Sequence, residues 1–359
     1  MLGSVIISGG GTGGHIYPAI AIADELRRRN PDIKILFVGA SDRMEMEKVP
    51  QAGYDIKGLW ISGFQRSLSL KNVMFPFKLL WSLIKAYSIV RKFKPQVAIG
   101  TGGYASGPTL FVANKMKIPT LIQEQNSFPG ITNRLLSKTV DSIAVAYSGM
   151  DRFFPEKITH ITGNPVRRDL INIAKPKQTD YEFFDLSSDK PILLVLGGSL
   201  GSKRINSLIG DHLDSILKLG VQVLWQTGKI YFDQYKSLAQ KGVSIHSYIS
   251  DMSQVYALSS YIISRAGASS VSELALAGKP VLFIPSPNVA EDHQRKNAEA
   301  IVNNGAAIMI VEKDLDSFES VFTNWISDPV VSQEMADNFR AMALPNATST
   351  IVNEIEGLI

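Results

Sequence analysis

The residues with the clearest potential for chemistry lie in two glycine-rich loops, each of which follows a short apolar run. Ser8-Gly9-Gly10-Gly11-Thr12-Gly13-Gly14-His15 comes directly after Val5-Ile6-Ile7, and Gly197-Gly198-Ser199-Leu200-Gly201-Ser202 comes directly after residues 192–196. Glycine permits tight turns, and the helix expected after each loop offers free N–H groups to an anion. The repeated pattern therefore predicts two nucleotide-binding domains that face one cleft.

The first loop also matches the dinucleotide fingerprint, as Gly9-x-Gly11-x-x-Gly14. That fingerprint requires an acidic residue at the end of the second strand, where it binds a ribose. Here the second strand, 34–38, ends in Gly39-Ala40-Ser41, so a nicotinamide or flavin coenzyme is not indicated. A purely structural loop, whose glycines let the helix pack closely against the strand, is the alternative.

His15 is the candidate general base. It lies at the start of the first helix, where the helix dipole favours a neutral imidazole that can accept a proton. A histidine that only hydrogen-bonds the loop or a ligand phosphate is the alternative. The remaining histidines show no metal-ligand spacing; they are His160, His212, His246 and His293. The single Asp-x-Asp, Asp314-Leu315-Asp316, is interpreted as a helix cap. We therefore expect no metal site.

Two further loops follow strands of the first half. Gly100-Thr101-Gly102-Gly103-Tyr104-Ala105-Ser106-Gly107-Pro108 follows the strand residues 96–99, and Gln123-Glu124-Gln125-Asn126-Ser127 follows the strand 119–122. Ligands of open α/β sheets bind at the carboxyl edge of the strands, so we expect these loops to form one anion-receptive surface with the first loop. For the Gln123–Ser127 loop, a turn in which Asn126 caps a helix is an equal alternative.

The second half carries two more candidate segments. Arg265-Ala266-Gly267-Ala268-Ser269-Ser270-Val271-Ser272-Glu273 follows the strand 261–264 and starts a helix. Its N–H groups could bind a diphosphate while Glu273 accepts two ribose hydroxyls; a capping box between Ser270 and Glu273 is the alternative. After the strand 280–284, Gln294 could bind a sugar hydroxyl or simply belong to an exposed, capped helix.

The elements that position these residues alternate between β-rich and helical patterns. Strands are predicted at 5–8, 34–38, 96–100, 119–122, 142–146, 159–162, 192–196, 221–226, 243–246, 261–264, 280–284 and 307–310, with helices at 17–29, 75–93 and 108–116. This alternation predicts an α/β fold of two Rossmann-like parallel-sheet domains. We place the domains at 1–163 and 164–340, and expect a helical tail at 341–359, whose return to the first domain is left open.

Composition excludes several classes of protein. With 359 residues, 45% of them hydrophobic, the chain can bury two cores, and without cysteine it has no disulfides, thiolate metal sites or cysteine nucleophiles. Neither a signal peptide nor a membrane-spanning run is indicated. The net charge of +4 fits an anionic partner but is too small to indicate nucleic acid.

Taken in order, these motifs resemble the MurG family, the peripheral membrane N-acetylglucosaminyltransferases of peptidoglycan synthesis, which have the two-Rossmann glycosyltransferase-B fold. The motifs that carry the resemblance are Gly10–Pro18, Gly102–Pro108, Glu124-Gln125-Asn126, Gly163-Asn164-Pro165-Val166-Arg167, Gly197–Gly201, Arg265–Ala268 with Ser272-Glu273, and Asp292-His293-Gln294. The resemblance implies UDP-N-acetylglucosamine as donor, lipid I as acceptor and lipid II as product, with no further cofactor. It also implies a role in cell wall biogenesis, cell shape and cell division, at the cytoplasmic face of the inner membrane.

The resemblance implies roles for individual residues. Those expected to bind the donor are Thr12, Gly13, Gly14, Asn126, Arg167, Ser199, Ile249, Ala268, Ser269, Ser270, Val271, Ser272, Glu273 and Gln294. Ile249 would offer backbone groups to uracil, and Glu273 would bind the ribose. Ser199 and the helix start at Ser269 would bind the diphosphate. Those expected to bind the acceptor are Gly102, Gly103 and Tyr104.

The implied reaction is an inverting displacement that needs a base. The family often has a histidine in the loop before the asparagine, where this chain has Gln123-Glu124-Gln125-Asn126. His15 is therefore the first candidate for the base and Glu124 is held in reserve. The alternatives are a UDP-N-acetylglucosamine 2-epimerase, another UDP-sugar transferase, and a non-enzymatic nucleotide-sugar-binding protein.

A lipid acceptor requires contact with a membrane surface, and residues 72–94 are the candidate segment. This stretch is apolar on more than one side, and Lys78, Lys85 and Lys92 recur along one stripe. It is interpreted as an interfacial helix, with a crossover helix that has solvated lysines as an equal alternative.

Overall fold

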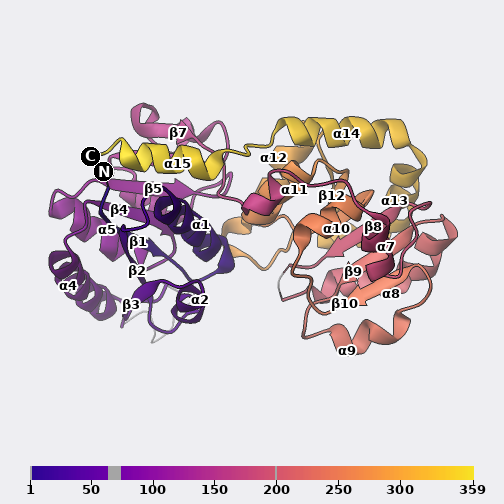
Figure 1. The fold of residues 1–359 in the computed structure, drawn as a ribbon, viewed down its shortest axis with the longest axis horizontal. Helices are drawn as coiled ribbons and strands as arrows, with labels where there is room; N and C mark the ends of the chain where they lie inside the picture. Colours follow the sequence, from indigo (N-terminus) through magenta and orange to yellow (C-terminus); the bar gives the residue numbers. More distant parts are fainter. Residues whose placement is uncertain (1, 64–73, 199) are drawn as a thin grey trace. The chain divides into compact units, whose positions relative to one another are not determined.

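The computed structural model describes residues 2–63, 74–198 and 200–359, which form two compact units (Figure 1). Unit 1 comprises Met1–Val166 and Leu344–Ile359, and unit 2 comprises Arg167–Ala343. Each unit contains one sheet in which every strand pair is parallel. The predicted α/β fold of two Rossmann-like domains is confirmed.

The sheet of unit 1 has seven strands in the order β3-β2-β1-β4-β5-β6-β7. Their bounds are β1 Ser4–Gly9, β2 Lys34–Ala40, β3 Asp55–Leu59, β4 Val97–Gly102, β5 Thr120–Glu124, β6 Ser142–Val145 and β7 Thr159–Ile161. The chain order reverses direction across the sheet between β1 and β4. At such a point two successive loops leave the carboxyl edge in opposite directions, which is where ligands of this sheet type bind.

Helices cover both faces of this sheet because the residues of β1 are apolar on both sides. They are α1 Gly13–Arg29, α2 Glu45–Gln51, α4 Phe75–Phe93, α5 Ser106–Lys115, α6 Ile131–Leu136 and α15 Ala347–Glu356, with short 3-10 turns η1 Met150–Arg152 and η2 Glu156–Ile158. Val5 and Ile7 pack with residues of α1 and α15, and Ile6 packs with residues of α4 and α5. Such burial on both faces is typical of parallel sheets.

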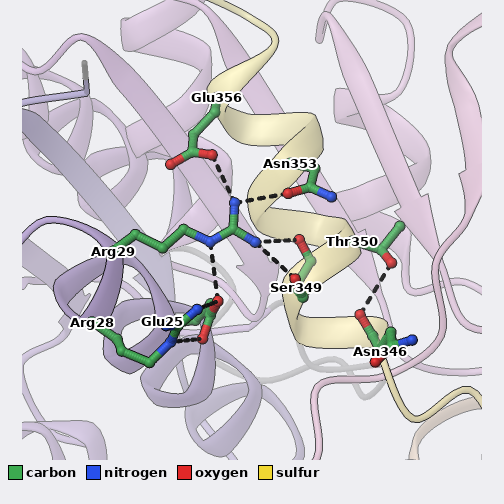
Figure 2. Close-up of polar contacts among 8 residues, drawn as sticks. All are labelled: Glu25, Arg28, Arg29, Asn346, Ser349, Thr350, Asn353 and Glu356. Carbon is green, nitrogen blue, oxygen red and sulfur yellow. Dashed lines mark hydrogen bonds and ion pairs between the residues drawn. The ribbon is translucent and has the colours of Figure 1, made fainter.

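Polar contacts fix α15, from the C-terminal end of the chain, against α1 (Figure 2). The Arg29 guanidinium donates to Asn353 Oδ1 and Glu356 Oε2, both over 2.7 Å, and to Ser349 Oγ over 2.8 Å. Its Nε donates to the buried Glu25 carboxylate over 3.0 Å. The tail that the sequence predicts to be helical therefore packs on unit 1 through both apolar and polar contacts.

The sheet of unit 2 has six strands in the order β10-β9-β8-β11-β12-β13. The strands are β8 Ile192–Leu196, β9 Gln222–Gln226, β10 Val243–His246, β11 Tyr261–Ser264, β12 Val281–Phe283 and β13 Ile308–Met309. The helices are α7 Gln178–Phe183, α8 Lys203–Lys218, α9 Phe232–Tyr235, α10 Met252–Leu258, α11 Ala268–Ala277, α12 His293–Val302, α13 Phe318–Ser327 and α14 Pro329–Ala341, with 3-10 turns η3 Arg168–Leu170, η4 Lys236–Leu238, η5 Ala290–Asp292 and η6 Glu312–Ser317. Its order also reverses direction next to the first strand, between β8 and β11.

One capping prediction is wrong. Asp314 lies inside η6, and the following helix α13 starts at Phe318 with Ser317 as its N-cap. The Asp314-Leu315-Asp316 segment therefore lies within its own 3-10 turn and does not cap α13, and Leu315 packs in the core of unit 2.

Candidate active site

The two glycine loops of unit 1 pack directly against each other. Because β1 and β4 are neighbours, the loops that follow them meet at the carboxyl edge of the sheet. The Gly10 N–H donates to Gly102 O over 3.3 Å. Gly103 has a φ of +89°, and a Cβ there would lie 2.3 Å from Gly10 O, so only glycine fits. The prediction that these two loops lie together is confirmed.

His15 lies in the first turn of α1, and its half-buried ring lies against the Gly102 loop. A Cβ on Gly102 would lie 2.7 Å from His15 Nδ1, so the glycine makes room for the ring. Nδ1 is 2.9 Å from Gln125 Oε1. Within the described residues Nε2 has no hydrogen-bond partner, so it is the ring nitrogen that is left for a substrate hydroxyl.

The N-terminus of α1 is open to a ligand. Thr12 is the N-cap of this helix in an extended conformation, and its side chain caps none of the helix N–H groups. Thr12 and Gly14 are exposed and Gly13 is partly exposed. Tyr104, from the neighbouring loop, is half exposed. These residues together offer backbone N–H groups and a phenol at one edge of unit 1.

Glu124, the reserve base, is fully engaged with its own loop. Its Oε1 accepts from the Asn126 N–H over 3.0 Å, and its Oε2 accepts from Asn133 Nδ2 over 2.8 Å and from the Gly130 N–H over 3.2 Å. The side chain is buried. This geometry favours a loop-ordering role for Glu124. Asn126 is not a helix cap, because α6 starts at Ile131 with Gly130 as N-cap.

Glu45 is a residue of this site that the sequence prediction missed. Its buried carboxylate accepts from the Gly11 N–H and from the Ala40 N–H, each over 2.9 Å. An acidic group therefore does meet the end of β2 and the first glycine loop, but it comes from α2 and binds the protein's own backbone. The prediction that no acidic residue lies at the end of the second strand is therefore correct only for residues 39–41, because the Glu45 side chain reaches that end from α2. The contact with Gly11 spans 34 residues, so no local spacing in the sequence signals it.

In unit 2 the glycine loop after β8 packs on the turn after β9. Gly201 has a φ of +80°, and a Cβ there would lie 2.0 Å from Thr227 O. Ser202 is the N-cap of α8, where its hydroxyl accepts from the Ile205 N–H over 3.2 Å. Ser199, predicted to bind the donor, lies outside the described residues.

The α11 segment brings several predicted donor residues together. The helix starts at Ala268, and Ser269 Oγ is buried without a hydrogen-bond partner among the described residues. Ser270 and Val271 follow in the same turn, and the Ser272 hydroxyl donates to Ala268 O over 3.2 Å. Because the N-cap is Gly267, the predicted capping box between Ser270 and Glu273 does not form.

Glu273 and Arg167 lie next to each other. Glu273 Oε1 is 3.9 Å from Arg167 Nε, and Glu273 Oε2 accepts from the Tyr256 hydroxyl over 3.4 Å. Burial raises the pKa of the Glu273 carboxyl, and the Arg167 guanidinium and the Tyr256 hydroxyl oppose that rise. Arg167 Nη1 also donates to Ser250 O over 3.5 Å, which brings the segment after β10 to this pair.

Ile249 and Gln294 have partners within unit 2. The Ile249 N–H donates to Gln226 Oε1 over 2.8 Å, and the Gln226 amide also donates to Gly198 O over 3.4 Å. A uracil ring placed against Ile249 would therefore meet a backbone N–H that already donates to Gln226. Gln294 Oε1 accepts from the Ser286 N–H over 2.9 Å, and its amide NH₂ remains able to donate. Gln226 was not predicted as a site residue.

Within the part of the chain that the structure describes, no three His, Asp or Glu residues lie close enough together to hold a metal ion. Among the described residues, these two sheet edges offer helix N-termini, amides, the His15 imidazole in unit 1, and two Arg–Glu pairs in unit 2, Arg167–Glu273 and Arg265–Glu312. Such groups bind phosphates and hydroxyls and can accept a proton.

Two profiles of one enzyme family match the chain. The glycosyltransferase family 28 N-terminal domain matches residues 5–145, and the glycosyltransferase family 28 C-terminal domain matches residues 192–351. The chain belongs to glycosyltransferase family 28. The predicted enzyme class, a glycosyltransferase, is confirmed by this family 28 membership.

Two relatives and one solved structure refine the placement within family 28. The chain is 57% identical over 356 residues to the UDP-N-acetylglucosamine--N-acetylmuramyl-(pentapeptide) pyrophosphoryl-undecaprenol N-acetylglucosamine transferase of Flavobacterium psychrophilum, covering 99% of this chain and 97% of the relative. It is 58% identical to the transferase of the same name from Christiangramia forsetii, with the same coverage. The crystal structure of Acinetobacter baumannii MurG superposes with a TM-score of 0.79 at 28% identity, covering 99% of both chains. The resemblance to the MurG family is confirmed.

Proposed function

We propose that this family 28 chain transfers N-acetylglucosamine from UDP-N-acetylglucosamine to the 4-hydroxyl of the N-acetylmuramoyl unit of lipid I, giving lipid II for peptidoglycan synthesis. The observation that carries the proposal is the 57% identity, over nearly the whole of both chains, to the Flavobacterium psychrophilum transferase. The site geometry supports the same chemistry. No observation favours the epimerase or the non-enzymatic alternative.

We assign the donor mainly to the second domain, 164–340. The N–H groups at the start of α11 and the unpartnered Ser269 hydroxyl suit a diphosphate. Glu273 suits the two hydroxyls of a ribose because a carboxylate accepts two hydrogen bonds at once. Arg167 supplies positive charge beside it. Ile249 and Gln294, with Ser199 outside the described residues, complete the proposed donor set from this domain.

We assign the acceptor to the first domain, 1–163, with the tail 341–359 as its helical support. Gly102, Gly103 and Tyr104 would bind the acceptor, and the open turn of Thr12, Gly13 and Gly14, with Asn126, would approach the donor. His15 Nε2 would take the proton of the 4-hydroxyl as its oxygen bonds to the anomeric carbon. The bond from that carbon to the diphosphate breaks, and its electron pair leaves with UDP.

Charge develops on the departing diphosphate and must be stabilised. Helix N-termini and Arg167 are the groups that this chain offers for the purpose. One helix dipole contributes only about 0.3–1 kcal/mol at an exposed site, so several such groups have to act together in a site with little water.

The proposed location is the cytoplasmic face of the inner membrane, with α4 as the contact. Among the described residues, no helix is both long and apolar enough to cross a bilayer. The side chains of Phe77, Leu80, Trp81 and Ile84 form the outer face of α4 and are 56–64% exposed. Lys85 and Lys92 are exposed beside them. An apolar face flanked by cations is typical of an interfacial helix.

Lys78 does not belong to this outer face. Its Nζ donates to Ser62 Oγ over 3.0 Å and lies 5.4 Å from the ring centroid of Trp60. Lys78 lies on the predicted stripe, seven residues before Lys85 on the same helix, but its ammonium is held by neighbouring residues. Lys85 and Lys92 are therefore the two lysines of this stripe that we expect to contact anionic lipid headgroups.

The proposal is tested by incubating the purified chain with radiolabelled UDP-N-acetylglucosamine and a lipid I analogue. The expected result is a labelled product that appears only when the acceptor is present. Conversion of the donor to its 2-epimer, or donor binding without any transfer, would support one of the alternatives and contradict the proposal.

A further inference from the structure

A chain of buried side-chain amides runs behind His15 in unit 1. Gln125 Oε1 lies 2.9 Å from His15 Nδ1, and Gln123 and Asn164 continue the chain away from the imidazole. All three amide side chains are at most 3% exposed. Polar groups removed from water are costly unless they are paired, so each of these amides is held in one orientation.

Oxygen atoms around Gln125 determine which way its amide points. Gln125 Nε2 donates to Thr101 O over 2.7 Å and to Gln123 O over 3.2 Å, and it also donates to Gln123 Oε1. A carbonyl oxygen only accepts, so the group that faces these three atoms must be the NH₂. The reversed amide would place an oxygen against three other oxygens. The Gln125 atom that faces His15 is therefore an acceptor.

The far end of the chain has the same polarity. Gln123 Nε2 donates to Asn164 Oδ1 over 3.0 Å, and Asn164 Nδ2 donates to Gln125 O over 3.0 Å. The Gln125 backbone carbonyl therefore fixes the orientation of the Asn164 amide, and Asn164 Oδ1 fixes the orientation of the Gln123 amide. None of the three side chains ionises, so the direction of the chain does not change with pH.

We propose that Gln125 is a positioning residue that selects the tautomer of His15, an inference that rests on the function proposed above. Because Gln125 Oε1 can only accept, neutral His15 carries its proton on Nδ1 and its lone pair on Nε2. Nε2 then takes the proton of the acceptor hydroxyl, while Nδ1 keeps its own proton and its bond to Gln125. The hydroxyl oxygen bonds to the anomeric carbon, and UDP leaves with the electron pair of the broken bond.

The opposite tautomer would be inactive. With the proton on Nε2, the Nδ1 lone pair would face the lone pairs of Gln125 Oε1, and the nitrogen that faces outward could not accept a proton. A wrong tautomer in an otherwise intact site is known to reduce catalysis strongly.

NMR of the substrate-free protein with ¹⁵N-labelled histidine measures the tautomer directly, since a protonated and an unprotonated ring nitrogen resonate far apart. The chain has five histidines, so the signals lost in His15→Ala assign His15. At a pH where the imidazole is neutral, we expect a protonated Nδ1 and an unprotonated Nε2. A protonated Nε2 in the wild-type protein would overturn the proposal.

The variant Gln125→Met removes the acceptor and keeps the length of the side chain. We expect His15 to populate both tautomers and kcat to fall by about tenfold or more, while KM for UDP-N-acetylglucosamine stays the same. The matched control is Gln222→Met in unit 2, a buried glutamine that donates to Ser187 O over 2.7 Å. It should change neither the tautomer nor kcat.

An unchanged tautomer in Gln125→Met would overturn the proposal even if kcat falls. If that variant does not fold, the wild-type spectrum alone decides. The spectrum needs no substrate, so it separates this inference from the proposed function. An Nδ1-protonated His15 in a protein that transfers no sugar would support the tautomer assignment and contradict the proposed function.

Discussion

Buried carboxylates at the carboxyl edge of unit 1 bind backbone N–H groups. Glu45 joins the first glycine loop to the end of β2, and Glu124 closes its own loop onto Asn133. Each carboxylate accepts hydrogen bonds from backbone N–H groups that would otherwise lack partners. We infer that these carboxylates hold the loops around His15 in one conformation.

Replacing Glu45 by alanine tests this role. Glu45→Ala leaves the Gly11 and Ala40 N–H groups without their acceptor, so we expect the free energy of unfolding to fall by about 1–3 kcal/mol. Urea unfolding measures the change. The matched control is Glu47→Ala on the same helix, whose side chain is 65% exposed, and its unfolding transition should stay at the wild-type position. Equal transitions for both variants would contradict the anchoring role.

Replacing Glu273 by glutamine tests the donor site. A hydrogen bond to a charged acceptor contributes about 1.5–3 kcal/mol, so Glu273→Gln should raise KM for UDP-N-acetylglucosamine by at least about tenfold. Steady-state kinetics measures the change. Glu319→Gln, an exposed glutamate of α13, is the control and should leave KM unchanged. An unchanged KM in Glu273→Gln would remove Glu273 from the donor site.

The raised pKa of Glu273 gives this site a pH dependence. Because burial raises the pKa, the carboxyl gains its proton at a higher pH than an ordinary glutamate does. Its protonated form accepts hydroxyl hydrogen bonds less well. KM for the donor should therefore rise as the pH is lowered in the wild type, and this rise should be absent in Glu273→Gln. A rise of the same size in both proteins would show that another group is responsible.

At the scale of single residues, the sequence reveals groups whose partners are close along the chain. His15 and the glycine loops form a contiguous pattern after a strand, which is why they were predicted. The partner of His15, Gln125, is 110 residues away, and Glu45 is 34 residues from Gly11. Contacts of this kind depend on which strands become neighbours, so no local spacing predicts them.

At the scale of elements, α4 has an inner and an outer face. Leu79, Leu83 and Ile89 pack on the core that includes Ala86 and Val90, which explains why the helix was predicted to be apolar on more than one side. Against the residues that the structure describes, the side chains of Phe77, Leu80, Trp81 and Ile84 on the outer face stay more than half exposed. Exposed apolar area of this kind typically marks an interaction surface.

Vesicle binding tests the outer face of α4. Replacing both Trp81 and Ile84 by serine removes apolar area that would enter the lipid, so we expect binding to anionic vesicles to weaken by about tenfold or more. Co-sedimentation measures it. Phe183→Ser in unit 2 removes an equally apolar side chain that is 72% exposed, and it should bind like the wild type. Equal binding by all three proteins would contradict the membrane role of α4.

The helix α15 should be essential to the stability of unit 1. Ile355 is fully buried between α15 and the sheet, so Ile355→Ala should lower the free energy of unfolding by about 2–5 kcal/mol. Hydrogen exchange of the α1 amides reports on unit 1. Ile359→Ala, which removes the same atoms at a site that is 55% exposed, is the control and should change little. Wild-type protection of α1 in Ile355→Ala would show that the helix is dispensable.

Most strands and long helices were predicted because their apolar residues follow a clear period. Residues 75–93 form a helix with the predicted bounds. The strand β3, Asp55–Leu59, was missed because Asp55, Lys57 and Gly58 interrupt its apolar residues at the edge of the sheet. The short helix α2 was missed because Pro50 lies inside it and most of its residues are polar.

At the scale of the whole molecule, the two units share the order of six strands, to which unit 1 adds β7, but they differ at the carboxyl edges of their sheets. In each sheet the first strand is third in the order, and the chain order reverses direction beside it. The loop of unit 1 carries an internal carboxylate, Glu45, and a candidate base, His15. The corresponding edge of unit 2 carries Gln226, Arg167 and the start of α11. The duplicated loop of the sequence therefore serves two different tasks in the proposed function.

The inverting transfer of one sugar to lipid I is tested most directly by one measurement. The chain is incubated with UDP-N-acetylglucosamine and a lipid I analogue, and the released UDP and the isolated disaccharide are quantified while proton NMR determines the new linkage. We expect UDP and disaccharide in equal amounts, with the new sugar joined to the 4-oxygen by a β-linkage. UDP released without disaccharide, or an α-linked product, would contradict it.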